Sequence, residues 1–587
     1  MRRWRPGHGH DHRATQLNAP EETDAPREPS LLDALVPLAT LVALIGGSLA
    51  LFGLDALDGP IQVALLLCCM VAALIAMKNG HAWEEVQRSG QGALGSVTSA
   101  FFILLAVGAL IGTWNLSGTI PTLVFYGIQV LSPSWYYLAT ALICGVVALS
   151  IGSSWTTAGT IGVGLVGIAG LLGVSPAITA GAVISGAYLG DKTSPLSETT
   201  ILSAQMVKAD TFDHIRAQVW TSVPAFALAC VAFAVLGFAG PPVENDVSTT
   251  VELARLDEIY RITPLNLLPL VLLAGLSIKK VPASLALITS ALFAAVLAGV
   301  LQPDVVHDFT AGLEDGRGGV LGSVQAGWQA MATGFSMESG IGDIDRLLSR
   351  GGMASMLPTL WLIMGAVTFG ALLDEFGLIG RLVLPVIAGT RTTGRLFLSV
   401  FAVAMGLNIV AGDQYIALVL PTRVFRAEFA RRGLDRTNLS RLAADSGTVT
   451  SPLVPWNSCG AFMGAVLGVG TLTYLPYCFF NLLSPVLSVA YGFTGFRARL
   501  HHRGHRLPHV HRQHAVGHRH RPGRRDHLPR RHDRRDARYR RRGARRAGRR
   551  PDPRPRGGPR RGDRHRHADR FGGAGARQGH VGPVRQR

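Results

Sequence analysis

Residues 187–203 read AYLGDKTSPLSETTILS, and they place charged groups inside an otherwise apolar, Gly/Ala-rich part of the chain. The stretch holds Asp191, Lys192 and Glu198, with Pro195 between them. A charged side chain near the centre of a bilayer costs roughly 2.5–3.5 kcal/mol on insertion scales, so such residues mark functional sites by default. Proline ends a helix and frees backbone carbonyls. The stretch therefore has the chemistry of an ion site within a membrane.

A second stretch, DSGTVTSPLVPWNSCGAFM at 445–463, repeats the tetrapeptide TSPL of residues 193–196 at 450–453. Both copies combine proline with hydroxyl, amide and carboxylate side chains. These groups are hard oxygen ligands, which suit a small hard cation rather than a soft metal. Two unwound segments at matching positions of two halves are a pointer to a transport site near mid-membrane.

Four carboxylates supply the charge for an exchange. Burial favours the neutral form of a carboxyl, so a proton and a sodium ion compete for the same oxygens. The predicted sodium and proton ligands are Asp191, Thr193, Ser194, Ser197, Glu198, Thr199, Asp413, Asp445, Thr450, Ser451 and Asn457. We expect no resident cofactor, because sodium and protons are the transported species.

Each carboxylate also has a structural alternative. Asp191 would be a helix cap or the partner of Lys192, Glu198 would only face a vestibule, Asp413 would be a turn residue, and Asp445 would be a surface cap. Lys192 would neutralise the site when no cation is bound, or reach towards the membrane surface.

The rest of the chain predicts the membrane helices that must position these residues. The 587 residues are 48% hydrophobic, with a mean hydropathy of +0.28. A run of about 20 apolar residues matches the hydrocarbon thickness. Clear runs lie at 33–54, 60–77, 93–113, 135–151, 217–239, 283–302, 355–372 and 476–496. We therefore expect an all-α, multi-pass membrane protein.

Charge placement predicts that the two halves lie in opposite orientations. The connections around 381–395 and 423–441 are rich in arginine, whereas those near 124–138 and 173–180 carry no charge. Arginine-rich loops stay in the cytoplasm, so the second-half connections are cytoplasmic and the first-half ones are not. This is the pattern of an inverted repeat. The basic segment before the first run places the N-terminus in the cytoplasm as well.

The same pattern predicts two re-entrant hairpins. Both ends of 395–429 are basic, so that segment enters the membrane and returns, and 135–172 does so from the other side. The tips are expected near 153–157 and 411–415. Irregular backbone at that depth is tolerated where protein buries it or water reaches it.

Four motifs resemble the NhaC-type sodium/proton antiporters: SGAYLGDKTSPLSETT, GTWNLSGTIP at 112–121, GDQYIALVLP at 412–421, and the 445–463 stretch. The resemblance spans most of 35–496. It places Asp191, Ser194, Ser197, Glu198 and Thr199 in the first signature, and Asp445, Thr450, Ser451 and Asn457 in the second. The family often has Asp where Glu198 stands here, which bears on cation affinity.

The resemblance implies a sodium/proton exchanger of the cell membrane with two inverted repeats, broken helices and re-entrant hairpins. It also implies an ion-transporter superfamily-like fold, a homodimer and an elevator-like motion. Relatives exchange sodium-coupled organic acids, so a sodium- or proton-coupled exchanger of small carboxylates of the malate or lactate type is the alternative. The sequence shows no HExxH, GxSxG or P-loop motif, and we expect no enzyme activity.

The domain organisation follows from these segments. We expect a disordered basic segment at 1–30, transmembrane repeats at 31–240 and 264–497, a linker outside the membrane at 241–263, and an Arg/His-rich low-complexity tail at 498–587. From Arg497 onward there are 31 Arg and 6 Asp. The tail therefore carries more positive charge than the net charge of +19 of the whole chain, and the rest of the chain is acidic. Binding of nucleic acid or anionic lipid by this tail is a further alternative. We favour a frameshift near residue 497, and with it no nucleic-acid partner.

Overall fold

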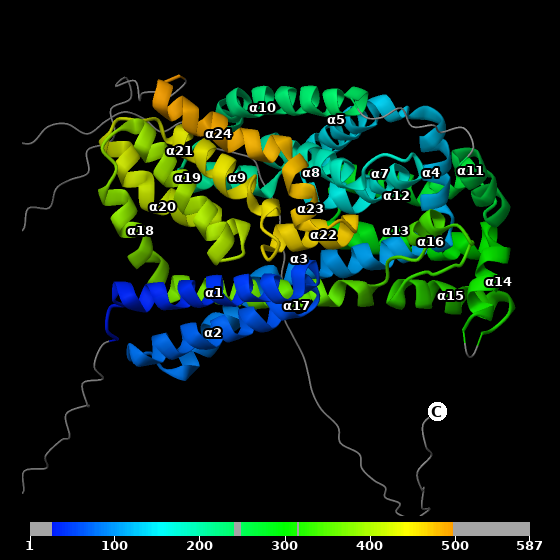
Figure 1. The fold of residues 1–587 in the computed structure, drawn as a ribbon, viewed down its shortest axis with the longest axis horizontal. Coiled ribbons are helices and arrows are strands. Elements are labelled where there is room, and N and C mark those ends of the chain that lie inside the picture. The colour runs from blue at the N-terminus through cyan, green and yellow to red at the C-terminus, as the bar shows by residue number, and fades with distance from the viewer. Residues whose placement is uncertain (1–25, 240–247, 314–315, 497–587) are drawn as a thin grey trace, which may run out of the picture. The chain divides into compact units, whose positions relative to one another are not determined.

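The computed structural model describes residues 26–239, 248–313 and 316–496, and these ranges are almost wholly helical (Figure 1). An isolated antiparallel bridge pairs Phe335 with Arg350. The predictions for residues 1–25 and for the 498–587 tail lie outside the described residues.

The first half contains α1 to α10. Their bounds are α1 Leu31–Phe52, α2 Pro60–Lys78, α3 Trp83–Leu116, α4 Thr119–Val130, α5 Pro133–Ile151, α6 Ser154–Thr157, α7 Val163–Leu171, α8 Pro176–Thr193, α9 Glu198–Met206 and α10 Thr211–Ala239. A 3-10 turn at Gly53–Asp58 joins α1 to α2, and a π-helical turn at Ala158–Gly162 joins α6 to α7.

The second half contains α11 to α24. Their bounds are α11 Ser248–Ile259, α12 Leu268–Ile278, α13 Ala283–Leu301, α14 Pro303–Ala311, α15 Gly319–Thr333, α16 Gly342–Leu348, α17 Leu357–Glu375, α18 Leu378–Ala388, α19 Thr393–Val410, α20 Gln414–Arg431, α21 Arg436–Ala443, α22 Ser458–Leu467, α23 Thr471–Tyr474 and α24 Phe479–Thr494. Short η turns precede or follow several of them: Pro264–Leu267, Met353–Met356, Ala444–Thr448, Ser451–Leu453 and Leu475–Tyr477.

Nine helices in the described ranges are long and apolar enough to cross a membrane, or up to eleven if each bent pair counts as one span. Helices satisfy their own backbone hydrogen bonds, which is what hydrocarbon demands. The prediction of an all-α multi-pass membrane protein is confirmed. The predicted last run, 476–496, is shorter as a helix, since α24 covers 16 residues.

The helices of the two halves repeat in order. The helices α5, α8 and α9 begin at Pro133, Pro176 and Glu198, and α19, α21 and α22 begin 260 residues later in each case. The long α3 has no continuous counterpart. At the same offset α3 falls on residues 343–376, which the chain divides between α16 and α17, with a 3-10 turn at Met353–Met356 between them.

The segments predicted as hairpins return to the end from which they start. The backbone N–H of Ser175 donates to the Tyr137 hydroxyl at 2.8 Å, which brings the end of the α5–α7 hairpin back to its beginning. Arg432 Nη2 donates to the Thr390 carbonyl at 2.6 Å and does the same for the α19–α20 hairpin. In Figure 1, α18 to α21 gather at one end of the molecule, whereas α4 lies towards the other. The hairpins therefore enter from opposite ends.

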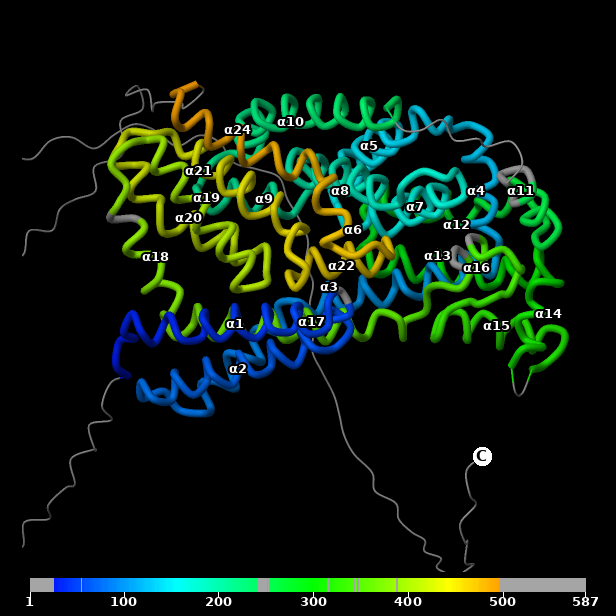
Figure 2. The backbone as a smooth tube through the Cα atoms, viewed as in Figure 1, coloured from blue at the N-terminus to red at the C-terminus, as the bar shows by residue number. Residues whose placement is uncertain are grey.

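Two groups of helices face each other (Figure 2). The lower helices, as drawn, are α1, α2, α3, α15 and α17, with α13 packed on α3 and α15. The upper helices are α5 to α10 and α19 to α24, in which α5 packs on α8 and α10, and α24 on α10 and α19.

Small residues allow the closest contact among the upper helices. A Cβ on Gly190 would meet the backbone of Ala148, and one on Gly186 would meet the carbonyl oxygen of Ala141. Close backbone approach through small residues is the usual way in which membrane helices associate. This contact holds the end of α8, and with it Asp191, against α5.

Candidate functional site

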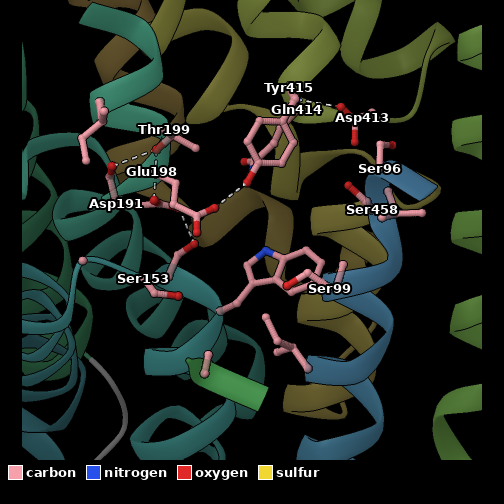
Figure 3. A pocket seen from close by; sticks show the side chains of 18 of the residues that line it. Ser96, Ser99, Ser153, Asp191, Glu198, Thr199, Asp413, Gln414, Tyr415 and Ser458 are labelled. Atoms are coloured by element: carbon pink, nitrogen blue, oxygen red, sulfur yellow. Dashed lines mark hydrogen bonds between the residues drawn. The ribbon is translucent and has the colours of Figure 1, made fainter. Parts of the chain in front are cut away.

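A cavity of about 1040 Å³ lies between the upper and lower helices (Figure 3). The two predicted hairpin tips both reach it, through Ser153–Thr156 and Asp413–Ile416. The broken segment after α8 contributes Pro195, Leu196 and Glu198. On the opposite side the cavity is lined by α3, α17 and the start of α13, including Ser96, Ser99, Asp374 and Ser284.

Asp191 occupies the last turn of α8 and lines this cavity, although its residue is only 6% exposed. Its Oδ2 accepts a hydrogen bond from the Ser154 hydroxyl at 2.6 Å. Its Oδ1 accepts from Ser197 at 2.7 Å and Thr199 at 3.0 Å. Three hydroxyl groups from two separate segments therefore surround one buried carboxylate. No lysine or arginine within the described ranges makes an ion pair with it.

The break in the helix explains how these groups meet. Pro195 cannot continue the helix, and α9 starts again at Glu198. The chain bends so that Thr199 and Thr200 donate their hydroxyls to the Asp191 backbone carbonyl at 3.0 and 2.9 Å. The carbonyl that we expected to be free for a cation is thus occupied by side chains in this conformation.

Two predicted residues of the first stretch point elsewhere. Thr193 donates to the Leu189 carbonyl of its own helix, and Ser194 donates to the Leu149 carbonyl of α5 at 2.8 Å. Both hydroxyls therefore serve the end of α8 and its contact with α5, and neither residue lines the cavity.

Glu198 and Asp413 face the same cavity from different halves of the chain. The Tyr415 hydroxyl donates to Glu198 Oε2 at 3.2 Å, joining α20 to α9. Asp413 is the N-cap of α20, and its Oδ1 accepts from the backbone N–H groups of Tyr415 and Ile416 at 2.8 and 3.0 Å. These hydrogen bonds are those expected if Asp413 is a turn residue. Asp413 nevertheless also lines the cavity.

Asp445 lies apart from the cavity. It forms an ion pair with Lys192 in which both side chains are fully buried. Asp191 precedes Ser194 by three residues, whereas Asp445 precedes Ser451 by six, so the two carboxylates occupy different positions on their helices. The structure thus places Asp445 with Lys192, and neither at the surface nor beside Asp191.

The remaining predicted residues of the second stretch form a buried network around Asn408. The Asn408 amide donates to Thr450 Oγ1 at 2.9 Å, and the Asn457 amide donates to Asn408 Oδ1 at 3.1 Å. Ser451 donates to the Thr448 carbonyl at 2.7 Å and approaches Gln414 Oε1 at 3.3 Å. These bonds hold the broken segment against the tip of the α19–α20 hairpin.

Several cavity residues were missing from the predicted ligand set. Ser154, Gln414 and Tyr415 lie within the hairpin tips that the charge pattern located, so that pattern was the available signal. Ser458 lies in the second stretch, beside Asn457, whereas Ser96, Ser99 and Asp374 carried no comparable signal. They reach the cavity because α3, α17 and α22 cross close to the hairpin tips.

The charges around the cavity are mixed, with an acidic excess. Its acidic residues are Asp191, Glu198, Asp374 and Asp413, and its basic residues are Lys280 and Arg423. A cleft with one dominant sign of charge and low-dielectric walls concentrates ions of the opposite sign. Among the described residues, no cluster of three or more His, Cys, Asp or Glu is arranged to hold a metal ion.

Comparison with known proteins places the chain. The sequence profile of the Na+/H+ antiporter family matches residues 7–221 and 186–496 of the chain. The chain is 35% identical over 440 residues to the Na(+)/H(+) antiporter NhaC of Alkalihalophilus pseudofirmus, covering 74% of this chain and 90% of that protein. The chain belongs to the Na+/H+ antiporter family. The resemblance seen in the motifs is confirmed, and so is secondary sodium–proton exchange as the class of function.

Relatives in and around this family differ in their named substrates. The chain is 34% identical to the Malate-2H(+)/Na(+)-lactate antiporter of Bacillus subtilis, with 80% of this chain and 96% of that protein covered. It is 34% identical to the Arginine/ornithine antiporter ArcD of Halobacterium salinarum, with 81% and 94% covered. Among solved structures, Neisseria gonorrhoeae MtrF aligns over 78% of this chain and 95% of its own, with 16% identity and a TM-score of 0.35.

Proposed function

We propose that this Na+/H+ antiporter family protein binds sodium at Asp191 and exchanges it for a proton at the same carboxylate. The observation that carries the proposal is the set of hydroxyls on that carboxylate: Ser154, Ser197 and Thr199 within 3.0 Å of its oxygens. Carboxylate and hydroxyl oxygens are hard ligands that suit a small hard cation. The group faces a cavity, so an ion reaches it from solution.

The exchange follows from what these oxygens do in each state. In the structure the hydroxyls donate to the carboxylate. A hydroxyl also carries lone pairs and can rotate, so the same three groups present oxygen to a cation when one binds. A proton on Asp191 would remove the negative charge that attracts the cation. Sodium and proton therefore exclude each other at one carboxylate.

An exchanger of small organic molecules is the second candidate, and one observation favours it. A cavity of about 1040 Å³ is far larger than a bare ion needs, and Arg423 and Lys280 line it together with the carboxylates. A carboxylate substrate would pair with these two cations. The four acidic residues of the same wall oppose such a substrate and favour a cation, which is why sodium stands first.

We further propose that the protein is a transporter without enzyme activity, that it lies in the cell membrane with its N-terminus in the cytoplasm, and that it forms a homodimer. The orientation is supported by the arginine-rich connections that gather with the start of α1 at one end of the molecule (Figure 1). Binding of nucleic acid or lipid through the tail stays a prediction, because the tail lies outside the described residues.

Inverted membrane vesicles test the proposal. With an acidified lumen, addition of sodium or lithium is expected to release protons from the lumen, whereas malate, lactate or arginine alone is not. The Asp191→Asn variant is expected to insert normally and to lose this response, because an amide cannot carry the exchanged proton. Asp304→Asn, an exposed acid outside the cavity, is the matched control.

Two results would contradict the proposal. A response that requires an organic substrate would favour the second candidate. Normal exchange and unchanged half-saturating sodium in Asp191→Asn would show that Asp191 is structural.

A further inference from the structure

A second cavity, of about 410 Å³, lies between α3, α7, α22 and the residues that follow α16. Its apolar wall includes Ile111 and Val163, and its polar wall includes Ser336 and Ser349. None of its lining residues lines the cavity that holds Asp191. In Figure 1, α16 lies towards the end where α4 is found, away from α18 to α21. The second cavity therefore belongs to the end opposite the arginine-rich connections.

Three elements form walls of both cavities, and on each of them the second cavity lies further along the chain. A residue that lines the Asp191 cavity is followed, seven or eight positions later, by one that lines the second cavity. At 1.5 Å per helical residue this is a displacement of about 10–12 Å. The pairs are Ile103 and Ile111 on α3, Thr156 and Val163 on the first hairpin, and Ser458 and Ala465 on α22.

An apolar layer of Val107, Gly159 and Phe462 separates the two cavities. Each of these residues lies three or four positions from both members of its pair, and therefore on the same helix face. A Cβ on Gly159 would meet Val107 Cγ2 at 2.9 Å. The Val107 and Phe462 side chains are fully buried. On the side of the Asp191 cavity, the Trp155 ring stacks on Phe462, with centroids 4.0 Å apart and an angle of 14°.

The far wall of the second cavity is built from irregular backbone. Thr333 ends α15, and the chain reaches α17 through bends, the short α16 and a 3-10 turn. The Gly352 N–H donates to the Gly108 carbonyl at 2.7 Å, which holds this segment against α3. Irregular backbone at membrane depth is tolerated where it lines a water-filled cavity. Ser336, Ser349 and Ser355 line the cavity and are exposed, so water reaches it.

The two cavities differ in charge. The Asp191 cavity has four acidic and two basic lining residues. Among the described residues that line the second cavity, Arg350 is charged and none is acidic. Arg350 Nη2 donates to the Gly468 carbonyl at 3.4 Å, at the end of α22. A cation is therefore concentrated in the first cavity and is not retained in the second.

We propose that the second cavity is the outer half of the ion path, and that Val107, Gly159 and Phe462 form the barrier between it and Asp191. Sodium binds on the acidic side of this layer and leaves through the second cavity when the layer opens. The inference rests on the proposed exchange at Asp191 and adds the route by which the ion reaches the opposite face of the membrane.

The alternative is that the second cavity is a packing gap behind α22 with no part in transport. The two roles differ in access and in leakage. A position deep in an ion path reacts with reagents from the outer solution, and a thinner barrier leaks. A packing gap would show neither property.

The first experiment measures access in a full-length protein without the six native cysteines. Val466→Cys places a thiol in the second cavity, and Leu467→Cys is the control, because Leu467 is adjacent and equally buried but does not line the cavity. We expect an impermeant thiol reagent to label position 466 in intact cells and to spare position 467. Ser99→Cys in the Asp191 cavity should be labelled in inverted vesicles instead.

The second experiment measures leakage through the layer. In proteoliposomes without sodium, we expect Phe462→Ala to dissipate an imposed pH gradient at least tenfold faster than the unmodified protein. Phe233→Ala is the control, since Phe233 is equally buried and packs on Phe479 of α24, but lines neither cavity. It should leave the gradient as stable as in the unmodified protein.

A variant with added bulk replaces Phe462→Ala if that protein fails to insert. Gly159→Ala places a methyl group against Val107, whereas Gly170→Ala of α7 would meet nothing within 4 Å. We expect Gly159→Ala to slow sodium-driven proton movement at least threefold, with unchanged sodium-dependent thermal stabilisation of the purified protein. Gly170→Ala should match the unmodified protein.

Three results would overturn the inference and leave sodium–proton exchange standing. They are no labelling of position 466 from outside, equal leakage in Phe462→Ala and Phe233→Ala, and equal rates in Gly159→Ala and Gly170→Ala. Absence of sodium-driven proton movement in the unmodified protein would instead remove the proposed function, and with it the role of the second cavity.

Discussion

The hydroxyl of Tyr415 donates a hydrogen bond to the carboxylate of Glu198 across the cavity, at 3.2 Å, although 217 residues separate them in the chain. Tyr415 follows the tip of the second hairpin, and Glu198 begins the helix after the first proline break. This bond closes one side of the space in front of Asp191 and joins the two halves at the site (Figure 3). It is therefore a contact that must change if an ion is to enter or leave along that side.

Removal of the Tyr415 hydroxyl tests this closure. A hydrogen bond to a charged acceptor contributes about 1.5–3 kcal/mol, and less where, as here, the donor is 40% exposed. We expect Tyr415→Phe to change half-saturating sodium about fivefold, with a normal yield of inserted protein. Sodium titrations of proton release from vesicles measure this. Tyr126→Phe, on α4 away from the cavity, should show no change; equal effects in both variants would refute the role of the bond.

The two threonines next to Asp191 separate the observed site from the predicted one. Thr199 donates to the carboxylate, whereas Thr193 donates to its own helix. We expect Thr199→Val to raise half-saturating sodium by about tenfold, which corresponds to about 1.4 kcal/mol. Thr193→Val should stay within about twofold. Reversal of this order, measured in the same vesicle assay, would mean that the break adopts another conformation when sodium binds.

The contact between α5 and α8 predicts a position where a single methyl group is costly. A Cβ on Gly190 would overlap Ala148, whereas one on Gly92 of α3 would meet nothing within 4 Å. Overpacking costs about 1–3 kcal/mol. Gly190→Ala should therefore lower the thermal midpoint of the detergent-purified protein by several degrees, and Gly92→Ala should not. Equal midpoints would show that α8 can shift away from α5 without loss.

The uncharged connections of the first half and the arginine-rich connections of the second half predict that the two hairpins enter the membrane from opposite sides. Ser175 closes the first hairpin and Arg432 the second. Single cysteines at these positions, in a protein without the six native cysteines, should differ in intact cells. An impermeant thiol reagent is expected to label position 175 and to spare position 432. Labelling of both from one side would indicate a parallel arrangement, and the shared cavity would then lose its geometric basis.

The tail is expected to be dispensable. Within the described ranges, every residue that lines the cavity lies before Phe496. We expect deletion of residues 498–587 to leave sodium-dependent proton release within about twofold of the full-length protein. Translation of the other two reading frames from residue 497 tests the frameshift separately. A properly inserted truncation that no longer exchanges would assign a role to the tail.

The sequence by itself determined the membrane-spanning class, the repeat and the positions of the broken segments. These features have local or global signals that need no folded structure. Helix length follows from the hydrocarbon thickness, orientation from the arginine count of each connection, and the helix breaks from Pro195 and Pro452. Both hairpin tips lie within the stretches that these signals indicated.

Only the tertiary structure decided which polar side chains share a site. Asp191 and Lys192 are neighbours in the chain, but successive residues of a helix point about 100° apart. Asp191 therefore lines the cavity, whereas Lys192 pairs with Asp445. Thr193 and Thr199 look equivalent in sequence, but the bend after Pro195 brings Thr199 alone back to the carboxylate. Ser154 joins them because glycines let α5 and α8 approach closely. The direction of a side chain depends on helix phase and on contacts between distant segments, and a linear pattern of residue types contains neither.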